Sequence, residues 1–288
     1  MATRLTISDI LQNKKDGKKL ACLACYDYIT ALLLDQVGID MIIVGDSLGM
    51  LALGHLTSSE VTVDEMLHHT KAVRRGARRT LVVADLPFLS YQIDMAEAIK
   101  TAGRFIKEAG ADAVKMEGST PYDIELVSRL VSLGIPVMGH IGCVPQPKYA
   151  GERAFVRTTE DAERLLDSAI LLQGAGAFSL ALETVPEPVA RLVSRSLRIP
   201  TIGYGSGSGC DGQTYKTDNL LNRSCGAAPR FGKAYADFTA IFQDAVKLYM
   251  RDVKDGAFPS VDPMLSFDTN EEEAFQAQLD MSPKVFTP

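Results

Sequence analysis

The chain has 288 residues, of which 46% are apolar and 23% charged, and its formal net charge is −6 at pH 7. This composition is typical of a globular protein with a sizeable core, and the length suits one large α/β barrel or two smaller domains. The acidic balance without a long basic run argues against a nucleic-acid partner, and no apolar run reaches the roughly 20 residues that a membrane-spanning helix needs.

Apolar, strand-like runs alternate with segments of helical period along most of the chain. Strands are expected at residues 19–27, 40–46, 79–88, 112–118, 135–142, 177–185 and 200–207, with a less distinct eighth strand within 212–220. Helices are expected at 28–38, 62–77, 95–110, 122–134, 159–176, 187–197 and 236–256. Several of these helices end at a glycine, which suits a C-cap.

Repeated βα units of this length predict a parallel sheet with right-handed crossovers. Seven or eight units predict an α/β fold of the (β/α)8 TIM-barrel type. A doubly wound open sheet is the alternative, but no G-x-G-x-x-G turn follows the first strand. We expect residues 1–260 to form the barrel with a short N-terminal helical segment, and residues 261–288 to form a surface or subunit-contact tail.

The remaining cues on cellular context are weak. The N-terminal residues lack the apolar segment of a secretory signal, so a cytoplasmic location is expected. Cys22 and Cys25 form a C-x-x-C pair, but strand alternation places positions three apart on opposite faces. We therefore expect all five cysteines to be reduced and mostly buried.

A charged or ionisable side chain closes nearly every strand from the first to the sixth. These residues are Asp27, Asp46, Asp85, Lys115 with Glu117, His140 and Glu183. In a (β/α)8 barrel the active site lies at these carboxyl ends. Asp27 is better explained as a helix N-cap, but Asp46 and Asp85 lie many residues before their helices and are poorly placed to cap them.

Lys115 and Glu117 lie two residues apart in one strand, so their side chains share one face, which we expect to be the barrel interior near its open end. A purely structural ion pair is one explanation. However, Asp46, Asp85 and Glu117 would bring three negative charges together, which favours a bound cation. Oxygen ligands without cysteine or clustered histidine favour a hard ion, Mg²⁺ first. The adjacent His68 and His69 lack a third ligand and are not interpreted as a zinc site.

Six ordered blocks between about residues 20 and 200 carry a family resemblance. They are VGDSLGM, HHTKAVRRGA, ADLPFLSY, ADAVKMEG, PVMGHIGCVPQ and LALETVP. The sequence resembles ketopantoate hydroxymethyltransferases of the phosphoenolpyruvate mutase/isocitrate lyase superfamily. The resemblance implies a (β/α)8 barrel, Mg²⁺, and transfer of a hydroxymethyl group from 5,10-methylenetetrahydrofolate to a 2-oxo acid through a metal-stabilised enolate. It also implies 3-methyl-2-oxobutanoate as the default substrate, a homo-oligomer, and a place in pantothenate biosynthesis.

The resemblance also implies residue roles. It assigns the metal ligands as Asp46, Asp85 and Glu117, the substrate contacts as Asp46, Ser47, Asp85 and Lys115, and the catalytic groups as Glu183, Lys115 and His140. Glu183 matches the proton acceptor, and burial at the end of an apolar strand is expected to raise its pKa. A buried Glu183 bonded to amides and a His140 satisfied in the core are the structural alternatives.

The chain departs from the family pattern in its second half. The loop at 148–157 differs, Tyr204 replaces an aliphatic residue, and the polar segment 214–218 replaces an apolar strand that ends in an aspartate, for which Asp218 is a candidate. These departures leave two alternatives open. One is an aldolase, lyase or alkyl transferase that acts on another 2-oxo acid without folate, and the other is a non-catalytic scaffold.

Overall fold

The computed structural model describes residues 4–143, 156–223, 229–260 and 267–281. Contacts divide the chain into two compact units, Met1–Asp237 and Phe238–Pro288. The first unit contains every strand within the described residues. The second contains α9 (Phe238–Lys254) and α10 (Thr269–Met281). The helix expected over 236–256 is therefore confirmed, whereas α10 lies in a segment for which only a tail was expected.

Eight parallel strands close into a barrel in chain order, which confirms the predicted (β/α)8 fold. They are β1 (Leu20–Ala24), β2 (Met41–Val44), β3 (Leu81–Asp85), β4 (Ala113–Glu117), β5 (Val137–Gly142), β6 (Ser179–Glu183), β7 (Thr201–Tyr204) and β8 (Gly212–Lys216). The indistinct eighth strand exists, and its five-residue pairing with β1 excludes the open sheet.

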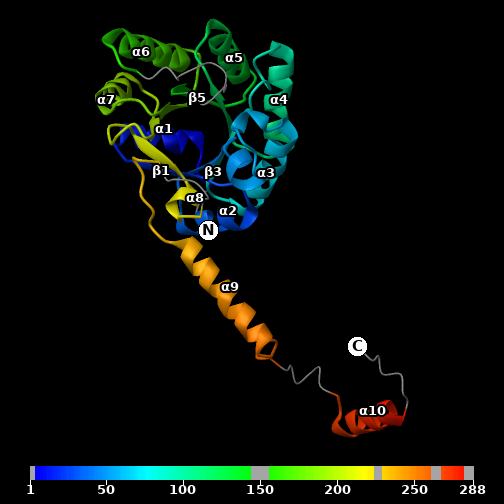
Figure 1. Ribbon diagram of the computed structural model, residues 1–288. Helices are drawn as coiled ribbons and strands as arrows, with labels where there is room; N and C mark the ends of the chain where they lie inside the picture. Colours follow the sequence, from blue (N-terminus) through cyan, green and yellow to red (C-terminus); the bar gives the residue numbers. More distant parts are fainter. Residues whose placement is uncertain (1–3, 144–155, 224–228, 261–266, 282–288) are drawn as a thin grey trace. The chain divides into compact units, whose positions relative to one another are not determined.

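Helices surround this barrel (Figure 1). They are α2 (Tyr28–Val37), α3 (Val63–Gly76), α4 (Met95–Lys107), α5 (Pro121–Ser132), α6 (Thr159–Gly174) and α7 (Glu187–Ser196), and α1 (Ile7–Lys15) precedes β1. Sequence analysis missed the short α8 (Thr217–Leu220), the π-helical turn Gly49–Leu53 and the 3-10 turn Ser58–Glu60. Asp27 caps α2 by accepting a hydrogen bond from the Thr30 amide at 2.8 Å, as expected.

The alternation of side chains along each strand builds two cores. Inward residues such as Leu81 and Val83 of β3 form an inner core, and Ile10 of α1 packs into it. The outward residues pack against the surrounding helices. Cys22 belongs to the inner core and Cys25 to the outer one, which confirms that they face opposite ways.

All four described cysteines are buried and free, and the fifth, Cys225, lies outside the described residues.

Among the described residues, no helix combines the length and apolar character that a bilayer crossing would require.

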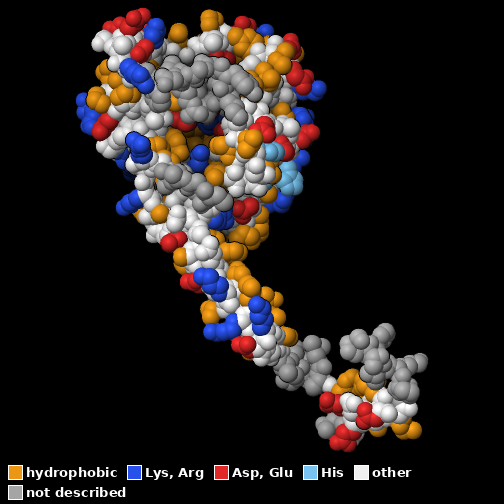
Figure 2. Space-filling model, in the orientation of Figure 1, with side chains coloured by type: hydrophobic (Ala, Val, Ile, Leu, Met, Phe, Trp, Pro, Cys, Tyr) orange, Lys and Arg blue, Asp and Glu red, His pale blue; other side chains and the backbone are white. Residues whose placement is uncertain are grey.

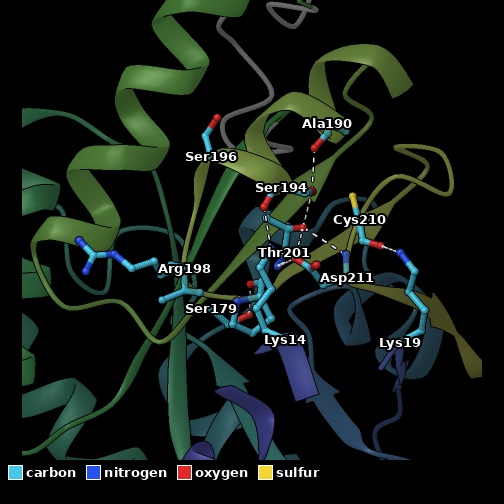
Figure 3. Close-up of polar contacts among 12 residues, drawn as sticks. Lys14, Lys19, Ser179, Ala190, Ser194, Ser196, Arg198, Thr201, Cys210 and Asp211 are labelled. Atoms are coloured by element: carbon cyan, nitrogen blue, oxygen red, sulfur yellow. Dashed lines mark hydrogen bonds and ion pairs between the residues drawn. The ribbon is translucent and has the colours of Figure 1, made fainter. Parts of the chain in front are cut away.

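A polar network joins α1 to the amino-terminal side of β7 and β8 (Figure 3). The Lys14 ammonium contacts the Ser194 carbonyl and the Asp211 carboxylate, each at 2.6 Å. Asp211 also accepts hydrogen bonds from the amide and hydroxyl of the fully buried Thr201, at 2.9 and 3.0 Å. These hydrogen bonds stabilise the amino-terminal end of the barrel, opposite the carboxyl ends of the strands.

We expect Asp211→Ala to lower the free energy of unfolding by about 2–3 kcal/mol, because it leaves the Thr201 donors and the Lys14 charge without their acceptor. Urea denaturation followed by circular dichroism measures the change. Lys18→Ala removes a well-exposed ion pair with Asp16 and serves as the control, with an expected loss under about 1 kcal/mol. Equal, small losses in both variants would contradict a structural role for the network.

Candidate active site

A pocket opens at the carboxyl ends of the strands, and Figure 2 shows a hollow in the barrel unit with charged side chains inside it. Its lining includes every residue that sequence analysis assigned to the site, namely Asp46, Ser47, Asp85, Lys115, Glu117, His140 and Glu183. Asp85, Lys115 and Glu117 extend the inward-facing rows of the inner core. The strand period therefore positions these charges at one end of the barrel.

Lys115 and Asp85 form a buried ion pair between neighbouring strands. They are register partners on β4 and β3, and the Lys115 Nζ lies 3.1 Å from Asp85 Oδ2. The Asp46 amide donates to the same oxygen at 3.3 Å. Burial and the nearby Asp46 raise the pKa of Asp85 to about 6, against the lowering effect of Lys115. Burial lowers the pKa of Lys115, but the surrounding carboxylates outweigh it, so the lysine remains charged.

His140 on β5 bridges two acids from the strands on either side. Its Nδ1 lies 3.2 Å from Glu117 Oε1, and its Nε2 lies 3.1 Å from Glu183 Oε2. Burial and Lys115 lower the pKa of His140, but the bonds to the two glutamates outweigh them and raise it to about 9. The imidazole therefore carries both protons at neutral pH and donates to both glutamates. The 3.1 Å approach of Lys115 Nζ to Nδ1 is then a contact between two donors, not a hydrogen bond.

The expected rise in the pKa of Glu183 is wrong. Burial raises the pKa, but the hydrogen bond and charge of His140 outweigh burial, and Lys115 and Lys216 add to them, so the net shift is downward. Glu183 is bonded to the imidazole of His140, whereas the structural alternative had it bonded to amides. His140 is buried with a partner on each ring nitrogen, and both partners are carboxylates that line the pocket.

Two carboxylate oxygens in the pocket remain without partners. Asp85 Oδ1 and Glu117 Oε2 are buried and make no hydrogen bond. Buried anionic oxygens in this state are costly, and a cation would satisfy both. However, within the described residues no three His, Cys, Asp or Glu side chains are gathered closely enough to hold an ion as they stand. The donor chemistry fits a hard cation, and Lys115 and His140 take up one oxygen of each acid.

Two tyrosines that sequence analysis did not single out contact residues of the site. The Tyr91 hydroxyl donates to the Glu117 carbonyl at 3.0 Å and lies 3.1 Å from the Glu117 amide nitrogen. The Tyr26 hydroxyl lies 2.8 Å from Ser47 Oγ. Both tyrosines are buried, and each follows a strand. Tyr91 also ends the sequence block ADLPFLSY, whereas Tyr26 lies in none of the six blocks.

The polypeptide turns sharply at Thr184, directly after Glu183. Thr184 has a φ of 54°, a left-handed conformation that is rare for a β-branched residue. Its amide donates to the Tyr204 carbonyl at 2.8 Å, and the residue lines the pocket. Such strain persists where the surrounding structure enforces it. Here the strained residue directly follows Glu183, the candidate proton acceptor.

The side of the pocket formed by β7 and β8 is aromatic and polar. It includes Tyr204, Tyr215, Lys216 and Phe231, and the rings of Tyr204 and Phe231 pack edge to face with centroids 4.9 Å apart. Lys216 was missed because the eighth strand was indistinct. Asp218, the candidate for a family aspartate, lies outside the pocket lining and pairs with Arg223 at 2.9 Å.

Two other sequence features do not join the site. Most of the altered 148–157 loop lies outside the described residues. His68 is exposed on α3, and His69 Nδ1 is bonded to the Tyr26 carbonyl at 2.7 Å. Among the described residues, neither histidine belongs to a group of side chains placed to hold a metal ion.

Comparison with solved structures supports the fold. The chain superposes on 2,3-dimethylmalate lyase, a member of the phosphoenolpyruvate mutase/isocitrate lyase superfamily, with a TM-score of 0.58 and 14% identity, covering 98% of this chain and 100% of that one. The phosphoenolpyruvate phosphomutase of Streptomyces platensis subsp. rosaceus gives 0.59 and 16%, with 96% and 99% coverage. At these identities the likeness shows the shared barrel fold alone.

Sequence comparison reaches further. A protein of Rippkaea orientalis named 3-methyl-2-oxobutanoate hydroxymethyltransferase is 47% identical over 256 residues, which cover 88% of this chain and 99% of the relative. A protein of the same name from Syntrophus aciditrophicus is 46% identical over 261 residues, with 90% and 96% coverage. The family model described as ketopantoate hydroxymethyltransferase matches residues 4–261. The chain therefore belongs to the ketopantoate hydroxymethyltransferase family of enzymes.

Proposed function

We propose that the protein transfers a hydroxymethyl group from 5,10-methylenetetrahydrofolate to 3-methyl-2-oxobutanoate, giving 2-dehydropantoate. Relatives of 46–47% identity carry the corresponding name, which supports the reaction type and the acceptor. The observation that carries the proposal is the convergence of a charged lysine, four carboxylates and an imidazolium in one pocket. This is the charge pattern that removal of a proton next to a ketone requires.

Mg²⁺ is the proposed cofactor, and Asp46, Asp85 and Glu117 would hold it. The unpartnered Asp85 Oδ1 and Glu117 Oε2 support this assignment because a hard cation prefers carboxylate oxygens. When bound, the ion would supply positive charge that stabilises the negative charge developing on the keto oxygen of the substrate. The raised pKa of Asp85 is also expected where carboxylates crowd together.

Lys115 and Ser47 are the proposed anchors of the 2-oxo acid. The Lys115 ammonium is buried, stays charged and is fixed by Asp85, so it offers a preorganised positive group for the substrate carboxylate or keto oxygen. Ser47 Oγ is oriented by Tyr26 and lines the same part of the pocket as Asp85. These contacts would orient the carbon acid before proton transfer.

Glu183 is the proposed proton acceptor, and His140 positions it. The lowered pKa keeps Glu183 ionised, which is the form that accepts a proton. The bond from His140 Nε2 fixes one carboxylate oxygen, and the other oxygen is available to the substrate. His140 also donates a hydrogen bond to Glu117, so the same imidazole positions both the proposed base and a proposed cation ligand.

The proposed reaction exchanges one carbon–hydrogen bond for one carbon–carbon bond. Water first adds to the methylene carbon of the donor, both bonds from that carbon to nitrogen break as the two nitrogens take up protons, and formaldehyde and tetrahydrofolate are released in the site. The proton next to the ketone moves to Glu183, and the electron pair left behind attacks the carbonyl carbon of formaldehyde. The oxygen of that carbonyl takes up the proton from Glu183, which completes the hydroxymethyl group.

A second candidate function uses a free aldehyde in place of the folate donor, as an aldolase would. Tyr204 and Lys216 make one side of the pocket polar, and this polarity favours the second candidate. Turnover with formaldehyde that is indifferent to the folate donor would support this candidate. Turnover that needs the donor would exclude it.

A homo-oligomer is also proposed, because α9 presents an apolar stripe. Its exposed side chains recur at helical spacing, and they are Phe238, Ile241, Phe242, Tyr249 and Val253. No residue of α9 is buried. Exposed stripes of this kind mark interaction surfaces, and a second copy of this chain is the proposed partner.

Glu183→Gln should abolish the proposed proton abstraction while leaving the fold intact. In D2O with Mg²⁺ and 3-methyl-2-oxobutanoate, the native protein should exchange the proton next to the ketone, as followed by NMR. We expect the variant to be slower by at least about 100-fold, in line with the usual contribution of a general base. Glu187→Gln, which changes an exposed acid at the start of α7, is the control. Unchanged exchange in Glu183→Gln would remove Glu183 from this role.

Calorimetric titration with MgCl2 tests the cation site directly. The native protein should bind one equivalent, and Glu117→Gln should weaken binding by about tenfold or more because a charged ligand is lost. Glu97→Gln changes an exposed acid of α4 and should bind as the native protein does. The absence of binding to the native protein would refute the proposed cofactor.

Analytical ultracentrifugation of the full chain tests the oligomer. The double variant Ile241→Glu/Phe242→Glu should sediment at a lower mass than the native protein, because charge replaces the apolar stripe. Lys247→Glu, on an exposed position of the same helix, should leave the mass unchanged. A monomeric native protein would contradict the proposal.

A further inference from the structure

The pocket contains a second lysine at the opposite side of the barrel from Lys115. Lys216 ends β8, where it is the register partner of Ala24 on β1. It shares the inward face of β8 with Gly212, which abuts Leu20 and Ile202 of the inner core. In a closed order of eight strands, β8 lies four strands from β4 in either direction. Lys216 and Lys115 therefore stand on opposite sides of the mouth, and both line the pocket.

The two lysines differ in what holds them. Lys115 is paired with Asp85 at 3.1 Å, whereas Lys216 forms no ion pair with any residue that the structure describes. The only described contact of its ammonium is the face of Tyr204, with 5.8 Å between Nζ and the ring centroid. Its charge acts on Glu183, which lines the same pocket, but the Glu183 carboxylate is bonded to His140. The ammonium of Lys216 is thus available to a ligand.

Tyr204 adds a second donor beside this ammonium. Its hydroxyl makes no hydrogen bond to any described residue, although the ring is held edge to face against Phe231. The close packing of Phe231 depends on Gly205, which has a φ of 66° and where an added Cβ would lie 2.6 Å from the Phe231 ring. The chain therefore fixes the Tyr204 ring in place while leaving its hydroxyl unbonded.

We propose that Lys216 and Tyr204 form a subsite for a ligand carboxylate distant from the 2-oxo acid group bound at Lys115. An ammonium and a phenol hydroxyl match the two oxygens of one carboxylate, and hydrogen bonds between ionised partners are the strong ones. A ligand that covers the Lys216 ammonium must also give it an anionic partner, because a shielded and unpaired charge is unfavourable, and the apolar tail of 3-methyl-2-oxobutanoate does not supply that partner. The subsite rests on the proposed function for the position of the 2-oxo acid group.

Two ligands can bring a carboxylate to this position. One is a 2-oxo acid that carries a second carboxylate at its far end. The other is the folate donor, whose glutamate tail carries carboxylates. The chemistry of recognition is the same in both cases, so binding measurements with each ligand must separate them.

Calorimetry with Mg²⁺ present compares two matched pairs of ligands. The first pair is 2-oxoadipate and 2-oxohexanoate. The second pair is tetrahydrofolate carrying three glutamates and the amide of tetrahydropteroate, which has no carboxylate. The proteins are the native chain, Lys216→Met, Tyr204→Phe and the control Lys233→Met. Lys233 also lies over a tyrosine, Tyr235, with 4.6 Å to the centroid, but it does not line this pocket.

The native chain and Lys233→Met should prefer the ligand with the distal carboxylate in one of the two pairs by about tenfold. Lys216→Met should lose this preference, and Tyr204→Phe should reduce it. The pair that shows the effect identifies the source of the carboxylate. Absence of a preference in both pairs would overturn the proposal. So would an equal loss of affinity for both members of each pair in Lys216→Met, which would mean that the lysine acts only through Glu183.

Failure of the proposed function gives a different result. If that function is wrong, the native chain will show neither Mg²⁺-dependent binding of any 2-oxo acid nor transfer of the hydroxymethyl group. The subsite, which is defined relative to the bound 2-oxo acid group, then fails together with the function. If the native chain instead binds a 2-oxo acid in the presence of Mg²⁺ but shows no preference in either pair, the subsite alone is overturned.

Discussion

The active site depends on holding a charged lysine and several carboxylates at the open end of an apolar barrel. Lys115 and Asp85 are each more than nine-tenths buried as side chains, and their Nζ and Oδ2 atoms are 3.1 Å apart. Breaking such a pair by removing one partner leaves an uncompensated charge and is strongly destabilising. The pair therefore fixes the positions of one positive and one negative charge in the site, and the neighbouring groups are oriented by these charges.

The barrel makes this arrangement possible because the alternation of side chains along its strands places both the apolar core residues and the charged residues on the inward face. The inward rows of β3 and β4 are apolar at the core and change to charged residues at their carboxyl ends. The polar network around Asp211 lies at the other end of the barrel, away from the charged side chains of the pocket. His140 then links β4 and β6 through Glu117 and Glu183, which no single strand could do.

Much of this could be predicted from sequence because strand period and strand ends are local signals. The shared face of Lys115 and Glu117 follows from their spacing, and the expectation that this face points inward came from the predicted barrel. The pKa direction of Glu183 could not be predicted, since its dominant partner, His140, comes from another strand 43 positions earlier in the chain. Lys216 was missed because polar residues obscured the alternation of β8. Tyr91 was missed because a loop tyrosine carries no periodic signal, although its hydroxyl supports the backbone of Glu117.

We propose that Asp46, which follows β2, together with Asp85 of β3 and Glu117 of β4, binds one divalent cation beside Lys115. The most direct test is an anomalous difference map from crystals soaked with Mn²⁺, a substitute for Mg²⁺ that can be located by its scattering. We expect one strong peak in direct contact with Asp85 Oδ1 and Glu117 Oε2, two buried oxygens without partners. A map with no peak in the pocket, or with a peak bound by neither oxygen, would contradict this proposal.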